Sequence, residues 1–388
     1  MRPTPPTRLP AQRPRHAPAI VAEPELLTRG GFLRSLALPL AAAVSFRLGA
    51  ALSVIGQPRM PPLVGPYSHV GVHQVRVSGT GCRAKVFYPA NSDGEKPAPY
   101  CTDGRATSDG MAGLVGFRQV GLSFLLAHLA DAPSGCTLDA PPIGDGCPRL
   151  IYSHGFGGNM DMASYFMRQL ASHGIVVVAL EHTDGTASRT VAADGAEAGF
   201  LPGRMSQRQQ LERRAAELNL ASDGSNLILE RGATAPLPPT TTTYLGGHSY
   251  GGPAALLAAA TAKTKVDGLL LHDPAVGMNG GIDAATGNAA EGRRIASFTS
   301  DEYDRAGVRC GATYHVMGGY HGNFVDAPLW APLWVMRPLS LVIPAAGPAE
   351  PEEVHAGLAR AAARFMREGA AAEGLGTAAP GLLEWRGR

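Results

Sequence analysis

Two short apolar runs constrain the fold more than any other feature of the chain. They read IVVVALEH at 175–182 and VDGLLLHD at 266–273. A strand that is apolar at successive positions has no face for solvent, so it must be covered on both sides. Strands of this kind belong to parallel sheets whose connecting helices pack on both faces. We therefore expect an α/β protein with a mostly parallel central sheet and helices on both of its faces.

Other segments alternate between strand-like and helix-like patterns, as this architecture requires. The helix expected at 204–220 is rich in charged residues, so we expect it to be exposed. Residues 109–131 form a further helical segment that is apolar almost all round, which favours burial, with contact to a membrane surface as the alternative. The remaining expected strands are 82–89, 149–153, 242–247 and 313–319, and the remaining expected helices are 162–174, 253–263 and 352–368.

The N-terminal segment differs in composition from the rest. Residues 1–22 are rich in proline and arginine and contain no acidic residue, and residues 28–53 contain an apolar run interrupted by Arg34 and Arg47. That stretch is too short and too charged for a membrane span. A basic leader before a small-residue apolar segment is typical of an organelle-targeting presequence. We expect residues 1–59 to be a targeting or disordered segment, bound for a plastid or mitochondrion, with cytoplasm and secretion as the alternative locations.

Charge and cysteine content exclude several classes of partner. The net charge of the 388 residues is +2 and no run of basic residues builds a patch, so we expect no nucleic-acid partner. The five cysteines lack the spacing of a zinc site, and the histidines and aspartates lack it too. Cys136 and Cys147 flank the loop TLDAPPIGDG and could form a disulfide, but unpaired thiols are the favoured expectation. We expect neither a metal nor a cofactor.

The stretch GGHSYGG at 246–252 contains the candidate nucleophile. Its centre matches the pattern G-x-S-x-G, in which a serine projects from a sharp turn between a strand and a helix. Gly247 and Gly251 would let the backbone pass close to itself, with Ser249 at the tip. A strand-like stretch precedes the motif and an alanine-rich helix follows it, as such a turn requires. We therefore expect Ser249 to be a nucleophile.

A serine hydroxyl needs a histidine as base and an acid to orient that histidine. In proteins with this turn the acid and then the histidine follow the serine, each at the end of a strand. Asp273 ends the second apolar run, and His321 follows the last strand, so we expect them to be the acid and the base. Asp301 is the rival acid, which the order of the strands disfavours. The other histidines after the serine sit inside predicted strands or, for His355, inside an exposed helix. Asp283 is expected in a glycine-rich loop with no strand before it.

The reaction also needs N–H donors for the oxyanion of its tetrahedral intermediate. One donor is expected to be the amide of Tyr250, directly after the serine. The second is expected in the glycine-rich loop SHGFGGN at 153–159, which follows a predicted strand. We assign it to the amide of Phe156. His154 in the same loop is interpreted as a residue that braces the loop.

Several motifs together resemble the platelet-activating factor acetylhydrolases, the group VII phospholipase A2 family of α/β-hydrolases. They are SHGFGGN, LASHGIVVVALEHTDGTAS, GHSYGG and HGNFVD, and the opening MPPLVGPYSHVGVHQVRV is also similar. The resemblance covers patches of residues 60–368. It implies a calcium-independent serine hydrolase that removes a short or oxidised sn-2 acyl group from phospholipids, with residues 60–388 as its catalytic domain. It also implies peripheral membrane contact through residues 111–129.

The resemblance implies the same site as the residues themselves do. Ser249 is the nucleophile, Asp273 the acid and His321 the base. The amides of Phe156 and Tyr250 hold the oxyanion. The expected partner is therefore a phospholipid or another lipid ester.

Departures from the family pattern leave the substrate open. Thr183 and Gly185 stand where the family has arginines, and residues 277–291 have no clear counterpart. The first alternative is another carboxylesterase, chlorophyllase- or cutinase-like, because LLLHDPAVGMN is also similar to the acid-bearing segment of chlorophyllases. A non-catalytic binding scaffold is the second alternative, which the presence of a full catalytic set disfavours.

Overall fold

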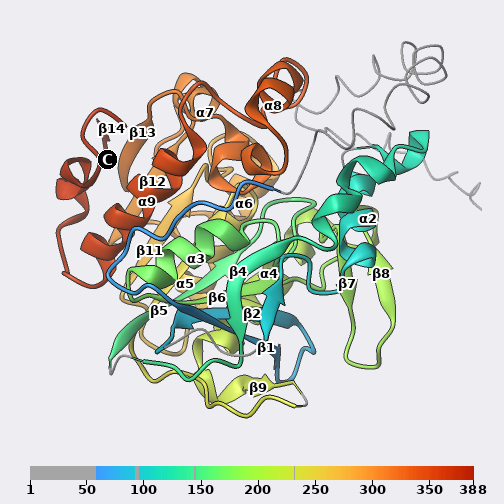
Figure 1. The fold of residues 1–388 in the computed structure, drawn as a ribbon. Helices are drawn as coiled ribbons and strands as arrows, with labels where there is room; N and C mark the ends of the chain where they lie inside the picture. The colour runs from blue at the N-terminus through green and yellow to red at the C-terminus, as the bar shows by residue number, and fades with distance from the viewer. Residues whose placement is uncertain (1–57, 92–95, 115, 144–145, 231) are drawn as a thin grey trace, which may run out of the picture.

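A computed structural model describes residues 58–388, apart from 92–95, 115, 144–145 and 231 (Figure 1). The predicted targeting segment therefore lies outside the described residues except at its last two positions. Among the helices of the described part, none has the length and apolarity needed to cross a membrane.

The fold is built around one twelve-stranded sheet. Its centre consists of neighbouring strands that all run parallel. The two apolar runs form β6 and β11, so the predicted α/β fold with a mostly parallel sheet is confirmed. In spatial order the parallel strands are β6 (Val176–Glu181), β5 (Cys147–Ser153), β10 (Thr240–His248), β11 (Gly268–His272), β12 (Ile295–Thr299) and β13 (Ala312–Val316).

Antiparallel strands extend this sheet on both sides. β2 (Arg83–Pro89) pairs with β6, and β14 (Leu383–Gly387) pairs with β13. A separate hairpin of β7 (Arg189–Val191) and β8 (Glu197–Gly199) was not predicted from the sequence. The other strands join the sheet on the β2 side: β1 (Val70–Val77), β3 (Pro97–Pro99), β4 (Pro133–Leu138) and β9 (Leu227–Leu229).

Helices cover both faces of the sheet (Figure 1). Successive side chains of a strand point to opposite faces. On β5, Leu150 and Tyr152 accordingly join the core beneath α3 and α9, whereas Ile151 joins the core beneath α4 and α5. The helices are α2 (Arg105–Leu114), α3 (Ser164–Ser172), α4 (Gln207–Ser222), α5 (Gly251–Thr261), α6 (Gly280–Thr286), α7 (Asp301–Arg305), α8 (Leu333–Leu339) and α9 (Pro351–Met366).

The helix predicted at 204–220 is less exposed than its charges suggest. α4 begins after Ser206, whose side chain forms a capping box with that of Gln209. Leu211 and Leu218 are buried in the core, but so are Arg214 and Glu217, which are 0% exposed. The prediction of an exposed helix is wrong because both charges have buried partners, which the pattern of a single helix does not reveal.

The continuous helix predicted at 109–131 is broken into pieces. Gly121 has a φ of +75° and separates two of them. Burial is confirmed for one side of the segment only, since Leu129 is fully buried and Val120 is 44% exposed. The pieces are α2 and two 3-10 helices at Arg118–Val120 and Ser123–Leu129.

Three smaller expectations can also be compared with the structure, which contradicts the first two and agrees with the third. His355, expected on an exposed helix, is fully buried because α9 packs on the sheet with that side inward. Asp283, expected in a loop, lies on α6. Cys136 and Cys147 form no disulfide, as favoured, since their side chains belong to the cores of opposite faces of the sheet.

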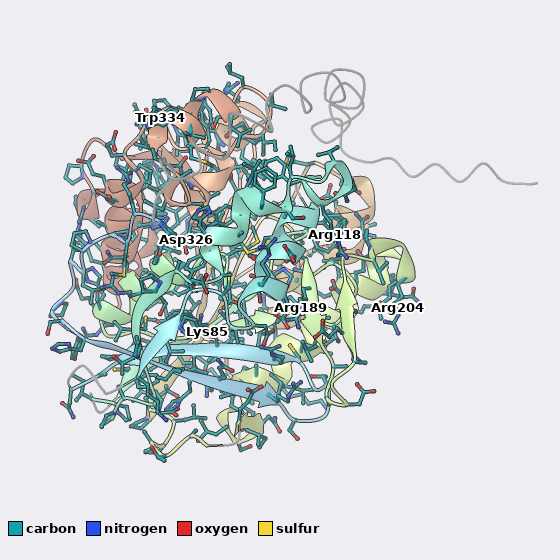
Figure 2. All side chains as sticks on the ribbon, turned by 45° about the vertical axis from the view of Figure 1, so that its right-hand side comes forward. Lys85, Arg118, Arg189, Arg204, Asp326 and Trp334 are labelled. Atoms are coloured by element: carbon teal, nitrogen blue, oxygen red, sulfur yellow. The ribbon has the colours of Figure 1, made fainter. Side chains whose placement is uncertain are left out.

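Lys85 on β2, labelled in Figure 2, is a buried cation with three hydrogen-bond partners. Its side chain is 1% exposed, and Nζ donates to Oδ1 of Asp161 at 2.9 Å. Nζ also donates to the carbonyl oxygens of Pro99 and Tyr100. The Asp161 carboxylate accepts the amide of Thr102 at 2.8 Å. These bonds join β2 to the segment that leads into α2.

Lys85→Met tests this buried ion pair. The variant keeps an apolar stem but leaves the Asp161 carboxylate buried without its cation, so we expect the free energy of unfolding to fall by about 3–5 kcal/mol. Guanidinium unfolding measures the change. Lys265→Met is the matched control, because that lysine is 84% exposed beside Asp267 and water screens its ion pair, so stability should change little. Equal losses in the two variants would contradict the prediction.

Candidate active site

The predicted site residues follow strands that end at one edge of the sheet. β5, β10, β11 and β13 run parallel, so their carboxyl ends lie together. The loop 153–159 follows β5, Ser249 follows β10, Asp273 follows β11, and His321 comes shortly after β13. Open α/β sheets bind their ligands at this edge.

Ser249 stands on a strained turn between β10 and α5. Its φ is +54°, a left-handed conformation that is uncommon for residues other than glycine. A Cβ on Gly247 would lie 2.4 Å from the carbonyl carbon of Gly251, and a Cβ on Gly251 would lie 2.1 Å from the carbonyl oxygen of Ser153. The turn therefore requires glycine at both positions.

Asp273 and His321 are in direct contact. Oδ2 of Asp273 lies 2.8 Å from Nδ1 of His321, and Oδ1 accepts the amide of Ser300 at 2.6 Å. Asp273 is fully buried, and its φ of +45° gives the chain a second left-handed turn next to the serine. Nε2 of His321 has no hydrogen-bond partner among the described residues, so it is available for proton transfer.

The rival acid, Asp301, pairs with a different histidine. Its Oδ1 lies 2.7 Å from Nε2 of His315, a histidine on β13. The geometry therefore brings Asp273, and not Asp301, to the histidine that we assign as base. The catalytic roles of these residues remain predictions.

Asp326, labelled in Figure 2, holds the loop of His321 against α3. This aspartate ends the motif HGNFVD, and its carboxylate accepts the amides of Tyr165 at 2.8 Å and of Phe166 at 3.2 Å. It also accepts the hydroxyl of Tyr100. Burial raises the pKa of Asp326 to about 7, although these hydrogen bonds oppose the rise. The motif thus ends in a buried anchor for the loop.

The two expected oxyanion donors lie next to Ser249. The loop that carries Phe156 runs beside the serine, because a Cβ on Gly155 would lie 3.2 Å from Cβ of Ser249. The rings of Phe156 and Tyr250 meet edge to face, with centroids 5.6 Å apart. Within the described part of the chain, neither of these two amides donates to another residue. Both are free to bind the oxygen of a ligand.

Arg214 on α4 supports the loop 153–159, and the sequence analysis did not predict this role. Nε donates to Oδ2 of Asp184 at 2.7 Å, and Nη1 donates to the carbonyl oxygen of His154. The guanidinium lies over the ring of Tyr250, 5.0 Å from its centroid. One buried side chain thus contacts both segments that carry the expected oxyanion amides.

His154 has the contacts expected of a loop-bracing residue. Nδ1 lies 2.7 Å from the carbonyl oxygen of Gly155, and Nε2 accepts the amide of His182 at 3.3 Å. Burial, and then the nearby Arg214, lower the pKa of His154 well below its usual value. The ring is therefore neutral and held in place.

A second serine, histidine and carboxylate form a chain beneath the loop. Nε2 of His182 lies 2.7 Å from Oγ of Ser153, and Nδ1 lies 2.7 Å from Oε2 of Glu217. Burial raises the pKa of Glu217 to about 7 and lowers the pKa of His182 well below its usual value. All three side chains are fully buried, so a substrate cannot reach the hydroxyl. We interpret this chain as support for the loop.

Two groups of side chains in the described part are close enough to share a metal ion. In each group one histidine is already hydrogen-bonded to the carboxylate. We therefore assign hydrogen-bonding roles to both groups. They are Cys82, His182 and Glu217, and His248, Asp273 and His321, with the ligand atoms of each group within 4.8 Å of one another.

The parallel sheet, its two helical layers and the serine turn define an α/β-hydrolase fold. Among solved structures, the ferulic acid esterase from Streptomyces cinnamoneus has a similar architecture. It superposes with a TM-score of 0.57 at 19% sequence identity, over 81% of this chain and 92% of the esterase. At that identity the likeness shows the fold alone.

Sequence comparison finds a similarity to one family over part of the chain. The model of the family described as platelet-activating factor acetylhydrolase, isoform II, matches residues 52–219. Two curated relatives are named platelet-activating factor acetylhydrolase, one from Canis lupus familiaris (28% identical over 143 residues) and one from Bos taurus (32% identical over 149 residues). Each alignment covers 36% of this chain and 32% of the relative, so it spans about a third of the relative's length. The chain is thus similar to this family of hydrolases over part of its length, as its motifs predict.

Gly247→Ala tests the close approach at the serine turn. The new Cβ would lie 2.4 Å from the backbone of Gly251, so the turn must open. We expect the free energy of unfolding to fall by about 1–3 kcal/mol, as for overpacking in a core, in guanidinium unfolding. A Cβ on Gly199 would meet nothing within 4 Å, so Gly199→Ala is the control and should change stability by about 0.5 kcal/mol or less. Wild-type stability in Gly247→Ala would refute the prediction.

Proposed function

We propose that this chain is a serine esterase that hydrolyses lipid esters, with Ser249 as nucleophile, His321 as general base and Asp273 as the acid that orients it. The observation that carries the proposal is the 2.8 Å contact between Asp273 and His321 at the sheet edge where Ser249 occupies its left-handed turn. A serine hydroxyl needs this combination of base and orienting acid. We assign the reaction to a catalytic domain at residues 60–388.

The proposed reaction has two steps. In the first, His321 accepts the hydroxyl proton of Ser249 as the oxygen attacks the ester carbonyl, and then passes that proton to the leaving alcohol. In the second, His321 takes a proton from water, which attacks the acyl-serine, and the proton returns to Ser249 as the acid leaves. Asp273 orients the ring of His321 throughout, through the contact between its Oδ2 and Nδ1 of the histidine.

The amides of Phe156 and Tyr250 are the proposed donors to the oxyanion of each tetrahedral intermediate. Both flank the serine, and neither has a competing acceptor among the described residues. Arg214 contacts both segments, so the donors need little rearrangement when charge develops on the substrate oxygen. Such preorganised donors contribute strongly to acyl transfer.

The proposed substrate is a phospholipid whose sn-2 acyl group is short or oxidised. Support comes from the relationship to the acetylhydrolase family and from an apolar rim beside the serine. In this rim the ring of Phe156 is 40% exposed and packs edge-on against Phe200, and the adjacent Leu201 is 54% exposed. No step of the proposed mechanism requires calcium or another cofactor.

We also propose that residues 111–129 contact the lipid surface. Leu129 anchors the segment in a buried cluster, while Val120 is 44% exposed and Phe124 and Leu125 are half-buried. A surface segment with an apolar side turned outward suits interfacial binding.

Ser249→Ala tests the proposed function. We expect kcat on a phospholipid with a short sn-2 acyl group to fall by at least about 10⁴-fold, because the nucleophile is lost. A fluorophosphonate probe should label the wild-type protein and not the variant. Ser225→Ala, which removes a hydroxyl from an exposed turn, is the matched control and should keep wild-type activity. Retained turnover in Ser249→Ala would exclude the proposal.

A panel of esters decides between the substrate classes. The alternative to a phospholipase is another carboxylesterase, chlorophyllase- or cutinase-like, since the rim of Phe156 and Phe200 suits other hydrophobic esters as well. Short-chain and oxidised phospholipids, chlorophyll and a cutin-like ester should be assayed side by side, with Ser249→Ala as the blank. Turnover of pigment or cutin-like esters alone would support the alternative.

A further inference from the structure

We propose that Tyr303 is a further catalytic residue, whose ring stabilises the protonated form of His321 during acyl transfer. The proposal rests on the proposed function, because it concerns the base of that reaction. It comes from a contact between α7 and the His321 loop that no sequence motif predicts.

The ring of Tyr303 is stacked on the ring of His321. Their centroids are 5.0 Å apart and their planes differ by 7°. Tyr303 is 8% exposed, so little water reaches the contact from its side. On another side of His321 the ring of His248 lies 4.3 Å away, inclined by 36°. The base is thus enclosed by two aromatic rings while its side chain remains 25% exposed.

The first turn of α7 sets the position of Tyr303. Ser300 caps this helix, because its hydroxyl accepts the amide of Tyr303 at 3.3 Å, and its own amide donates to Asp273 at 2.6 Å. The amide of Asp301 donates to the carbonyl oxygen of Gly319 in the loop before His321. One short turn therefore joins the acid, the base and the stacked ring.

Among the described residues, four titratable side chains surround His321. They are Asp273 after β11, His248 on β10, and Glu302 and Tyr303 on α7. Burial raises the pKa of Tyr303 and of Glu302, and it lowers the pKa of His248 well below its usual value. The two rings that enclose the base are therefore uncharged near neutral pH.

An aromatic face attracts a cation within about 6 Å of its centre. A general base carries an additional positive charge after it accepts a proton, and His321 does so in both steps of the proposed reaction. The ring of Tyr303 therefore favours the charged state over the resting state. An interaction that is stronger in the transition state than in the ground state raises kcat.

The test must separate the ring from the hydroxyl, because the Tyr303 hydroxyl also hydrogen bonds to Ser249. Tyr303→Phe removes the hydroxyl and keeps the ring, and Tyr303→Leu removes both. Phenylalanines with progressively more ring fluorines at position 303 keep the shape and weaken the charge of the ring face. For each protein, kcat and KM are measured from about pH 5 to pH 9, where the acidic limb reports protonation of the general base.

We expect Tyr303→Phe to leave the acidic limb of the pH profile of kcat at the same pH. Its kcat should fall only by the amount that the hydroxyl contributes. Added fluorines should lower kcat stepwise and move the acidic limb to lower pH, because protonation of the base becomes harder. Tyr303→Leu should lower kcat by a further factor of about 3 to 30, with KM little changed. Tyr67→Leu, in the segment before β1, is the control and should match the wild type.

An unshifted acidic limb in Tyr303→Leu, or a fluorinated series without a trend, would overturn this inference and leave the proposed function standing. If the leucine variant does not fold, the fluorinated series decides alone, since it keeps the packing. If the wild-type protein shows neither ester turnover nor labelling of Ser249, the proposed function falls and this inference with it.

Discussion

The close approach of Gly247, Gly251 and Ser153 is the contact on which the rest of the site depends. No side chain stands at either glycine, so β10 can turn into α5 sharply enough to hold Ser249 at a φ of +54°. The same approach brings the end of β5 against this turn, and with it the loop that carries Phe156. The serine and its expected oxyanion donors are thus placed by one packing arrangement of backbone against backbone.

Buried charges make that arrangement rigid. Arg214 is paired with Asp184, and it also holds the carbonyl oxygen of His154. Burying a charge costs free energy unless it is paired and hydrogen-bonded, and each charge here has such partners. Because donors aimed at a developing charge act best when they need not move, a network that stabilises the loop also suits acyl transfer.

Prediction from the sequence succeeded where the signal was local and failed where it depended on distant partners. The apolar runs that became β6 and β11 indicated buried parallel strands, because each has no polar face. Arg214, by contrast, lies between Leu211 and Leu218 on the apolar side of α4. A charged residue there does not fit the apolar pattern of a helix face, so the pattern did not indicate a buried role for it. Its partner Asp184 is remote in sequence, and nothing in the pattern of α4 predicts it. The stacking of Tyr303 on His321 was missed for the same reason.

The sequence by itself determined the α/β class, the parallel sheet and the order in which Ser249, Asp273 and His321 follow their strands. Apolar periodicity and glycine spacing are local properties of the chain, and local properties suffice for those conclusions. Only the tertiary structure decided that Asp273 rather than Asp301 contacts His321, and that an aromatic ring covers the base. These outcomes depend on strand order and on how loops pack at one edge of the sheet, which are set by the burial of the whole core.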